Sequence, residues 1–170
     1  MIVSIHLPAL IKNVMRKISV VLFLSVIMLA SCVKSNDRNC STVNVTAPAS
    51  EVEALRTYLH DNNITATEDS RGFFYQIVSA GNATKPNVCD VITFDYAGKL
   101  TNGTQFDAGS NVTYYLSNLI VGWQEGIPLI GVGGSIKLYL PPSLGYGSSA
   151  NGDIPANSNL IFDVSLSNVQ

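Results

Sequence analysis

The sequence predicts an α+β domain in which an antiparallel sheet packs on one short helix. Segments with alternating apolar residues, a pattern typical of half-buried strands, recur from residue 73 onward. Between them lies a Gly-rich segment, 121–129, whose composition suits a short helix better than a strand. The 13 glycines and 7 prolines favour short strands joined by tight turns over a helical bundle.

The first 31 residues have the features of a signal peptide. Lys12, Arg16 and Lys17 form a positive patch, and residues 18–30 are uncharged and mostly apolar. This run of 13 residues is shorter than the roughly 20 that a membrane-spanning helix needs. It suits the apolar part of a signal peptide better than a buried core helix. We expect translation to start at Met15, which directly precedes the basic pair and the apolar run.

The apolar run ends in Leu29-Ala30-Ser31-Cys32, which resembles the bacterial lipobox. In lipobox proteins the chain is cut before the cysteine, whose sulfur carries a diacylglycerol. The resemblance implies an envelope protein that is anchored to a bacterial membrane through lipidated Cys32, in the periplasm or at the cell surface. Plain secretory cleavage near Ala30 is the alternative.

Besides Cys32 of the lipobox, the sequence has two cysteines, Cys40 and Cys89. An exported protein folds in an oxidising compartment, where two remaining cysteines can pair. We therefore expect a disulfide that ties the N-terminal segment to the domain. Two separate buried thiols are the alternative.

The exported chain begins with a polar segment and a helix. Residues 32–49 contain many Ser, Asn and Thr and few large apolar residues, which predicts a lipid-anchored tether. Residues 50–62 predict a helix with Ser50 as its N-cap, and Glu53 completes a capping box.

One face of this predicted helix is apolar. Its members recur at helical spacing and are Val52, Leu55, Tyr58 and Leu59. We expect this face to dock on the following domain, with binding of a partner protein as the alternative. Residues 50–72 are thus a helical extension, and residues 73–170 form the domain.

Four segments of the domain predict strands. Residues 73–78 are aromatic and β-branched, and apolar residues alternate with polar or small ones over residues 91–100, 135–140 and 162–167. Residues 121–129 predict one or two turns of helix.

Charge and histidine content exclude several functions. The formal net charge is −2 and no basic stripe is present, which argues against binding to nucleic acid. The two histidines are His6 in the leader and His60 on the predicted helix. A Ser-His-Asp triad or a histidine-rich metal site needs histidines, and His60 is the single one after the leader. We therefore expect neither a metal nor another cofactor.

Six aromatic residues occur in different parts of the domain, each next to a glycine, an aspartate or a turn. They are Tyr96, Phe106, Tyr114, Trp123, Tyr146 and Phe162. Their pattern fits ordinary core packing as well as a binding site, so spacing alone does not decide between the two.

Ordered motifs surround these aromatic residues. Residues 94–107 contain Tyr-Ala-Gly-Lys-Leu-Thr-Asn-Gly and then Phe-Asp, and residues 119–126 have the sequence Leu-Ile-Val-Gly-Trp-Gln-Glu-Gly. Residues 131–147 end in Leu-Pro-Pro-Ser-Leu-Gly-Tyr-Gly, and residues 154–164 begin with Ile-Pro and end in Leu-Ile-Phe-Asp-Val. In this order and at this spacing, the four blocks resemble the FKBP-type peptidyl-prolyl cis/trans isomerases over roughly residues 74–169.

The resemblance implies a twisted antiparallel sheet of about five strands that wraps over the short helix and forms a cleft for an X-Pro dipeptide. Trp123 would be the floor under the proline ring, and the hydroxyl of Tyr146 and the backbone N–H of Ile120 would bind substrate carbonyls. The implied catalytic residues are Tyr96, Phe106, Asp107, Tyr146 and Phe162. The implied substrate-binding residues are Tyr114, Leu119, Ile120, Trp123 and Ile154.

One departure from the family pattern concerns Asp107. Residues 108–113 lack the basic residue that pairs with this aspartate in eukaryotic members. We therefore expect Tyr96 or backbone N–H groups to hold the Asp107 carboxylate.

The function implied by the resemblance is a peptidyl-prolyl isomerase that assists the folding of exported proteins and uses no cofactor. Its partners would be X-Pro-containing polypeptides, the membrane through its lipid anchor, and the macrolide inhibitors of the family. One alternative is a non-catalytic module of the same fold that acts as a chaperone or protein-binding surface. Another is an unrelated β-sandwich adhesin, which is excluded if residues 121–129 are helical and line a cleft.

Overall fold

The computed structural model of the chain describes Cys40 and residues 43–170. The predicted signal peptide, the start at Met15 and the lipidation of Cys32 lie outside the described residues. No helix among the described residues is long and apolar enough to cross a membrane.

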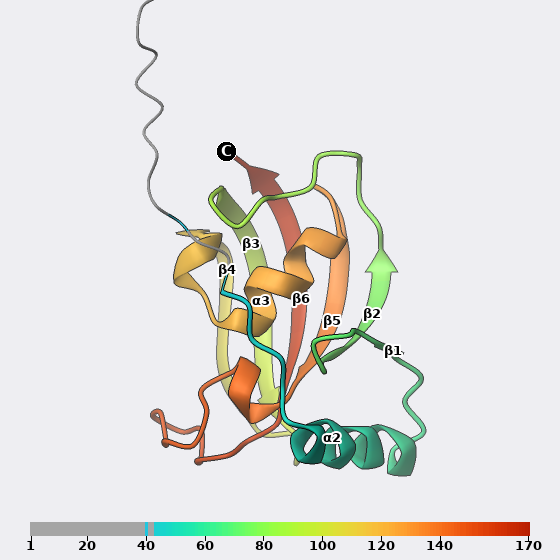
Figure 1. Cartoon of the computed structure of the whole chain (residues 1–170). Helices are drawn as coiled ribbons and strands as arrows, with labels where there is room; N and C mark the ends of the chain where they lie inside the picture. Colours follow the sequence, from blue (N-terminus) through green and yellow to red (C-terminus); the bar gives the residue numbers. More distant parts are fainter. Residues whose placement is uncertain (1–39, 41–42) are drawn as a thin grey trace, which may run out of the picture. The chain divides into compact units, whose positions relative to one another are not determined.

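The domain is built on an antiparallel sheet of six strands in the order β1-β2-β5-β6-β3-β4 (Figure 1). The strands are β1 (Thr67–Glu68), β2 (Phe74–Ser79), β3 (Val91–Leu100), β4 (Gln105–Tyr115), β5 (Ser135–Leu140) and β6 (Leu160–Val169). The predicted α+β class with an antiparallel sheet is confirmed. The count exceeds the expected five because the short β1 adds to the edge of β2.

The alternation predicted from the sequence places one face of the sheet in the core. Ile92 and Phe94 on β3, Leu138 on β5 and Phe162 and Val164 on β6 are all at most 2 % exposed. Burial of each such side chain contributes roughly 1.5–3 kcal/mol relative to exposure. The inward face of the sheet therefore supplies most of the apolar surface on which the short helix packs.

The short helix α3 (Val121–Gly126) packs very closely on the sheet and continues into a 3-10 helix, Ile127–Leu129. A Cβ atom added to Gly122 would lie 2.5 Å from the Leu140 side chain, and one added to Gly126 would lie 2.6 Å from Leu138. Only glycine allows this approach to β5. The predicted helix over residues 121–129 is confirmed, and Figure 1 shows α3 crossing the sheet in front of β6.

Strand β4 was not predicted from the sequence. It is the last strand of the sheet and pairs only with β3, and none of its residues is buried. Its sequence, Gln-Phe-Asp-Ala-Gly-Ser-Asn-Val-Thr-Tyr-Tyr, has no regular apolar alternation because only Phe106 and Val112 pack, partly buried, against the core. Its pairing with β3 is also irregular between Phe94 and Tyr96.

Helix α2 (Ala49–Asp61) forms the N-terminal extension, and its apolar face docks on the domain as predicted. Val52, Leu55 and Leu59 are buried in the same core cluster as the sheet residues, and Tyr58 packs against that cluster. The extension is therefore part of the folded unit.

The predicted N-cap of this helix was wrong by two residues. The N-cap is Pro48, whose carbonyl accepts hydrogen bonds from the N–H groups of Glu51 and Val52. Ser50 lies inside the first turn and provides no side-chain cap. Glu53 pairs with Arg56 instead of completing a capping box.

The end of the predicted tether is also ordered against the domain. Ala47 is 7 % exposed, and its N–H donates a 2.9 Å hydrogen bond to the Arg71 carbonyl. A Cβ added to Gly72 would lie 2.6 Å from Val52, so glycine allows the return of the chain past α2.

Cys40 and Cys89 form a disulfide, with their Cα atoms 5.7 Å apart.

Candidate active site

An open cavity of about 210 Å³ lies between α3 and the strands β3, β4 and β6. Its walls come from segments that are distant in the sequence and that the sheet brings together. The lining residues are Phe94, Tyr96, Asp107, Tyr114, Asn118, Leu119, Ile120, Trp123, Tyr146 and Phe162.

Trp123 forms the base of this cavity. It lies on α3, is 4 % exposed, and has its indole surrounded by three aromatic rings. The ring centroids of Phe94, Tyr96 and Phe162 lie 5.2, 5.3 and 5.0 Å from that of Trp123, each in an edge-to-face arrangement. Aromatic pairs in this arrangement attract one another beyond their burial alone. The indole is therefore held in one orientation by rings from β3 and β6.

One wall carries a hydrogen-bonded pair, Tyr96 on β3 and Asp107 on β4. The Tyr96 hydroxyl donates to Asp107 Oδ2 at 2.7 Å. Burial raises the pKa of Tyr96, and the hydrogen bond to Asp107 raises it further. The phenol therefore keeps its proton at neutral pH and remains a donor to the carboxylate.

Glycines in the sheet make room for this wall. A Cβ at Gly109 would lie 2.7 Å from the Tyr96 ring, and a Cβ at Gly98 would lie 2.7 Å from both Phe106 and Phe162. Where the pairing of β3 with β4 is irregular, the Asp95 carboxylate accepts hydrogen bonds from Asn111 N–H at 2.6 Å and from the Ser110 hydroxyl at 2.8 Å. These contacts fix β4 beside the cavity.

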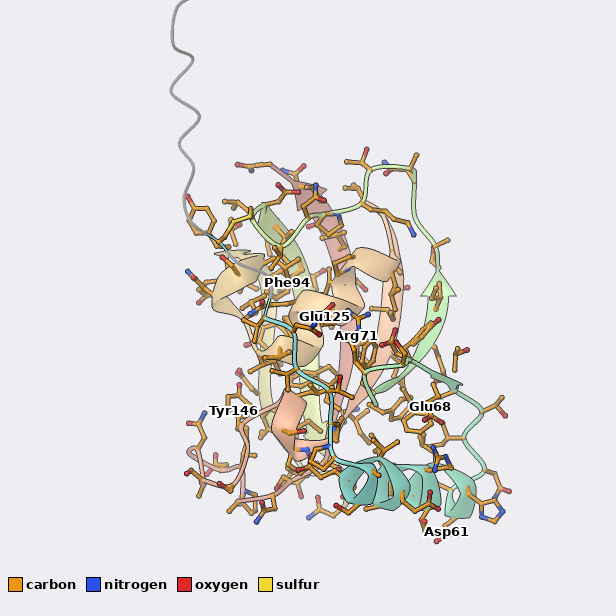
Figure 2. The ribbon with its side chains drawn as sticks, viewed as in Figure 1. Asp61, Glu68, Arg71, Phe94, Glu125 and Tyr146 are labelled. Carbon is orange, nitrogen blue, oxygen red and sulfur yellow. A yellow bond between two sulfur atoms is a disulfide. The ribbon has the colours of Figure 1, made fainter. Side chains whose placement is uncertain are left out.

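Tyr146 closes another side. It follows the 3-10 helix Pro142–Leu144 (Figure 2), and it is 37 % exposed and lines the cavity. Burial raises the pKa of its phenol, and the negative charge of Asp107 adds to this effect. The hydroxyl is thus a neutral donor at physiological pH.

The segment before α3 is held by Gln124, a buried polar residue that is 8 % exposed. Its side-chain amide donates to the Leu119 carbonyl at 2.8 Å and to the Ser117 carbonyl at 3.3 Å. This fixes Leu119 and Ile120 at the rim of the cavity.

The sequence profile of the family described as FKBP-type peptidyl-prolyl cis-trans isomerase matches residues 82–167, about half of the chain. The chain belongs to this family. FKBP-type peptidyl-prolyl cis-trans isomerase FkpA of Aeromonas hydrophila is 39 % identical over 118 residues, which are 67 % of this chain and 43 % of that protein. The protein of the same name from Escherichia coli strain K12 is 41 % identical over 105 residues, 59 % of this chain and 39 % of that protein. The chain thus matches less than half the length of these relatives.

Solved structures have the same FKBP fold. The crystal structure of FkpA from Escherichia coli matches with a TM-score of 0.63 and 36 % identity, over 72 % of this chain and 58 % of that one. A peptidyl-prolyl cis-trans isomerase structure from Pseudomonas syringae matches with a TM-score of 0.63 over 75 % of this chain and 99 % of that one. At 24 % identity, the second comparison supports the fold alone.

Most of the residues expected from the FKBP motifs lie around the cavity. Those that line it are Tyr96, Asp107, Tyr114, Leu119, Ile120, Trp123, Tyr146 and Phe162. Because α3 is helical and lines this cavity, the β-sandwich alternative is excluded.

Two of the expected residues are not among those that line the cavity. Phe106 is partly buried and packs edge-to-face on Phe162, with ring centroids 5.6 Å apart, so its place in the cavity wall stays a prediction. Ile154 is 6 % exposed and belongs to the buried core.

Two further lining residues were not predicted, Phe94 and Asn118. The alternation of Ile92, Phe94 and Tyr96 along β3 is the sequence signal that could have identified Phe94. Nothing in the sequence distinguishes Asn118 from other loop residues. Among the described residues, no group of three or more His, Cys, Asp or Glu side chains could hold a metal ion.

Proposed function

We propose that this FKBP-type protein catalyses cis/trans isomerisation of X-Pro peptide bonds in polypeptides. The observation that carries the proposal is the cavity floor, Trp123, which three aromatic rings surround while a phenol and a carboxylate lie on the walls. A flat apolar floor suits the pyrrolidine ring of proline, and the few polar groups suit the peptide backbone on either side of it.

The reaction needs no bond to be made or broken. Rotation about the prolyl amide is slow because twisting removes the partial double bond, at a cost of about 18–20 kcal/mol. A planar amide has more charge separation than a twisted one. An apolar cavity that excludes water therefore disfavours the planar ground state more than the twisted transition state.

The polar groups would hold the substrate while it rotates. The Tyr146 hydroxyl and the Ile120 N–H would each donate a hydrogen bond to a substrate carbonyl, which fixes the chain on both sides of the rotating bond. Asp107, oriented by Tyr96 at 2.7 Å, would place a carboxylate beside the amide. Phe106 would act indirectly, by supporting the Phe162 ring on which it packs.

The N-terminal sequence supports a proposal about the cellular setting. We propose that the protein is exported, is anchored to the membrane through a lipidated Cys32, and accelerates the folding of other exported proteins. Slow X-Pro isomerisation limits the folding of many chains, so a tethered isomerase in the envelope would have substrates. Binding of the family's macrolide inhibitors in the same cavity is part of this proposal.

Two measurements test these proposals. A prolyl-peptide isomerisation assay on the purified chain tests the activity. The intact mass of the membrane-extracted protein tests the anchor. The expected mass is that of a chain that begins at Cys32 and carries a diacylglyceryl group on this cysteine. A mature N-terminus at any other residue would contradict the anchor and leave the isomerase proposal standing.

A further inference from the structure

Arg71 joins the N-terminal extension to the helix that carries the cavity floor. Its guanidinium pairs with Asp69, at 2.7 Å, and with Glu125 on α3. All three side chains are largely shielded from water, with exposed fractions of 27 % for Arg71, 15 % for Asp69 and 17 % for Glu125. Figure 2 shows Arg71 and Glu125 side by side, where the extension passes α3.

The local structure holds Arg71 in place. Asp69 accepts hydrogen bonds from the Arg71 backbone N–H at 2.9 Å and from its side chain at 2.7 and 3.1 Å. The guanidinium also lies over the ring of Phe73, 5.5 Å from its centroid, and Phe73 is fully buried. The contacts with Asp69 and Phe73 thus hold the Arg71 side chain in place. Because Arg71 is itself fixed, its ion pair with Glu125 restrains α3.

Helix α3 has only six residues, and its packing rests on Trp123, Gln124 and the two glycines. Glu125 lies two residues after Trp123 in this helix. The glycines at 122 and 126 set how closely α3 approaches β5, but they provide no side chain that stops it from rotating or sliding. The ion pair at Glu125 adds a restraint to those that Trp123 and Gln124 already provide.

A second polar contact joins the extension to another wall of the cavity. The Glu51 carboxylate, in the first turn of α2, accepts a 2.9 Å hydrogen bond from the Ser143 N–H. Ser143 lies in the 3-10 helix that precedes Tyr146. The extension thus contacts α3, which carries the cavity floor, and also the segment that carries Tyr146.

We propose that Arg71 is a positioning residue of the isomerase site, which acts through Glu125 to hold α3 and Trp123 in place. The Glu51–Ser143 contact supports the Tyr146 segment in the same way. The proposal rests on the proposed isomerase function, and it makes the extension, which precedes the residues matched by the family profile, a working part of the site.

The test uses the full chain with four variants. Arg71→Met removes the charge, Arg71→Lys keeps it, Glu125→Gln removes the partner charge, and the fourth combines Arg71→Met with Glu125→Gln. The matched control is Arg56→Met, which removes an arginine of the same extension that pairs with Glu53 and Glu68 on the surface, away from α3. Trp123 is the only tryptophan, so acrylamide quenching of its fluorescence reports directly on the cavity floor.

We expect Arg71→Met and Glu125→Gln each to lower kcat/KM by roughly 3- to 30-fold, less than the roughly hundredfold that a 1 Å displacement near a reacting centre can cost. The double variant should lose no more than the more impaired single variant, because the pair between Arg71 and Glu125 is already removed in each of them. Arg71→Lys should recover part of the loss. Quenching of Trp123 should rise in the impaired variants and stay unchanged in Arg56→Met.

Several results would overturn the proposal. One is a kcat/KM for folded Arg71→Met and Glu125→Gln within twofold of the Arg56→Met control. Another is a loss that matches only the fraction of unfolded protein measured by circular dichroism. If Arg71→Met does not fold, Glu125→Gln decides alone, because it removes the charge with almost no change of shape.

The failure of the isomerase proposal gives a different result. In that case the wild-type chain itself does not accelerate prolyl isomerisation. The quenching data then decide on Arg71 alone: increased quenching in Glu125→Gln, but not in Arg56→Met, supports its positioning of Trp123, and equal quenching contradicts it.

Discussion

The Tyr96 hydroxyl donates a 2.7 Å hydrogen bond to Asp107 Oδ2 across the neighbouring strands β3 and β4. This contact gives the carboxylate a partner in a segment that lacks a basic residue, and it confirms the expectation that Tyr96 holds Asp107. The bond orients two side chains that line the same cavity as Trp123. The site therefore combines a fixed apolar floor with a fixed polar wall.

No single polar group should be indispensable if the cavity works by excluding water and positioning the substrate. Asp107→Ala and Tyr146→Phe should each lower kcat/KM by roughly 3- to 100-fold, about 0.7–2.7 kcal/mol, as expected for one hydrogen bond or one charge. Asp163→Ala is the matched control, because Asp163 pairs with Lys137 and does not line this cavity. An equal loss in the control, or complete loss with Tyr146→Phe, would contradict this mechanism.

Phe162 should contribute to both stability and activity. Its ring is 2 % exposed and packs on Trp123 and Phe106, so Phe162→Ala should destabilise the fold by about 3–5 kcal/mol. It should also lower kcat/KM at least as much as Asp107→Ala, since it admits water beside the indole. Phe74→Ala, a buried phenylalanine outside the cavity, should lose comparable stability without that loss of activity. Equal activity losses per folded molecule would refute the role of Phe162.

Stability should fall at alkaline pH because the fold favours neutral tyrosines. Burial raises the pKa of Tyr139 to about 12, with a further contribution from the charge of Asp163, and burial also raises the pKa of Tyr96 and of Tyr146. The folded state then holds these protons more tightly than the unfolded chain does. Their stabilising effect is complete below the unfolded pKa of about 10 and is lost as pH rises through the folded values.

Urea unfolding between about pH 9 and 12 measures this dependence. The free energy of unfolding should fall with rising pH, and Tyr139→Phe should reduce the slope because one shifted group is removed. The comparison of slopes cancels the pH-independent cost of losing the hydrogen bond from Tyr139 to Gln76. An unchanged slope in Tyr139→Phe would show that this tyrosine does not contribute.

The Cys40–Cys89 disulfide should stabilise the domain. It closes a loop with a sequence separation of 49 residues, which is worth about 4 kcal/mol in the chain-entropy account. A Cys32→Ser chain unfolded without reductant should show no free thiol, and Cys40→Ser in that background should show one. Two thiols in the first chain would refute the pairing.

The strands that the sequence predicted are those with one face in the core. Ile92, Phe94 and Tyr96 alternate along β3 because alternate side chains of a strand point to opposite faces, and only one face is buried there. Strand β4 lacks this pattern because it lies at the sheet edge with no buried residue. Its existence depends on pairing with β3, and local sequence does not encode such a partner.

The site was predicted through the family motifs, with limits that follow from packing. Motifs identify residue types and order, but not depth: of the expected residues, Ile154 is buried in the core and Phe106 packs on Phe162, and neither is among those that line the cavity. The contact between Arg71 and Glu125 joins residues of different elements with no shared periodicity. Pairs of this kind become visible only when the fold brings the elements together.

The rate of X-Pro isomerisation in a proline-containing test peptide, measured with and without the purified full chain, tests the central claim most directly. The account predicts acceleration in proportion to protein concentration. This acceleration should be insensitive to a chelator and to His60→Ala, since His60 is a largely exposed residue of α2 outside the cavity. An uncatalysed rate with folded protein that still binds the peptide, seen as a change in Trp123 fluorescence, would contradict it and would identify a binding module without turnover.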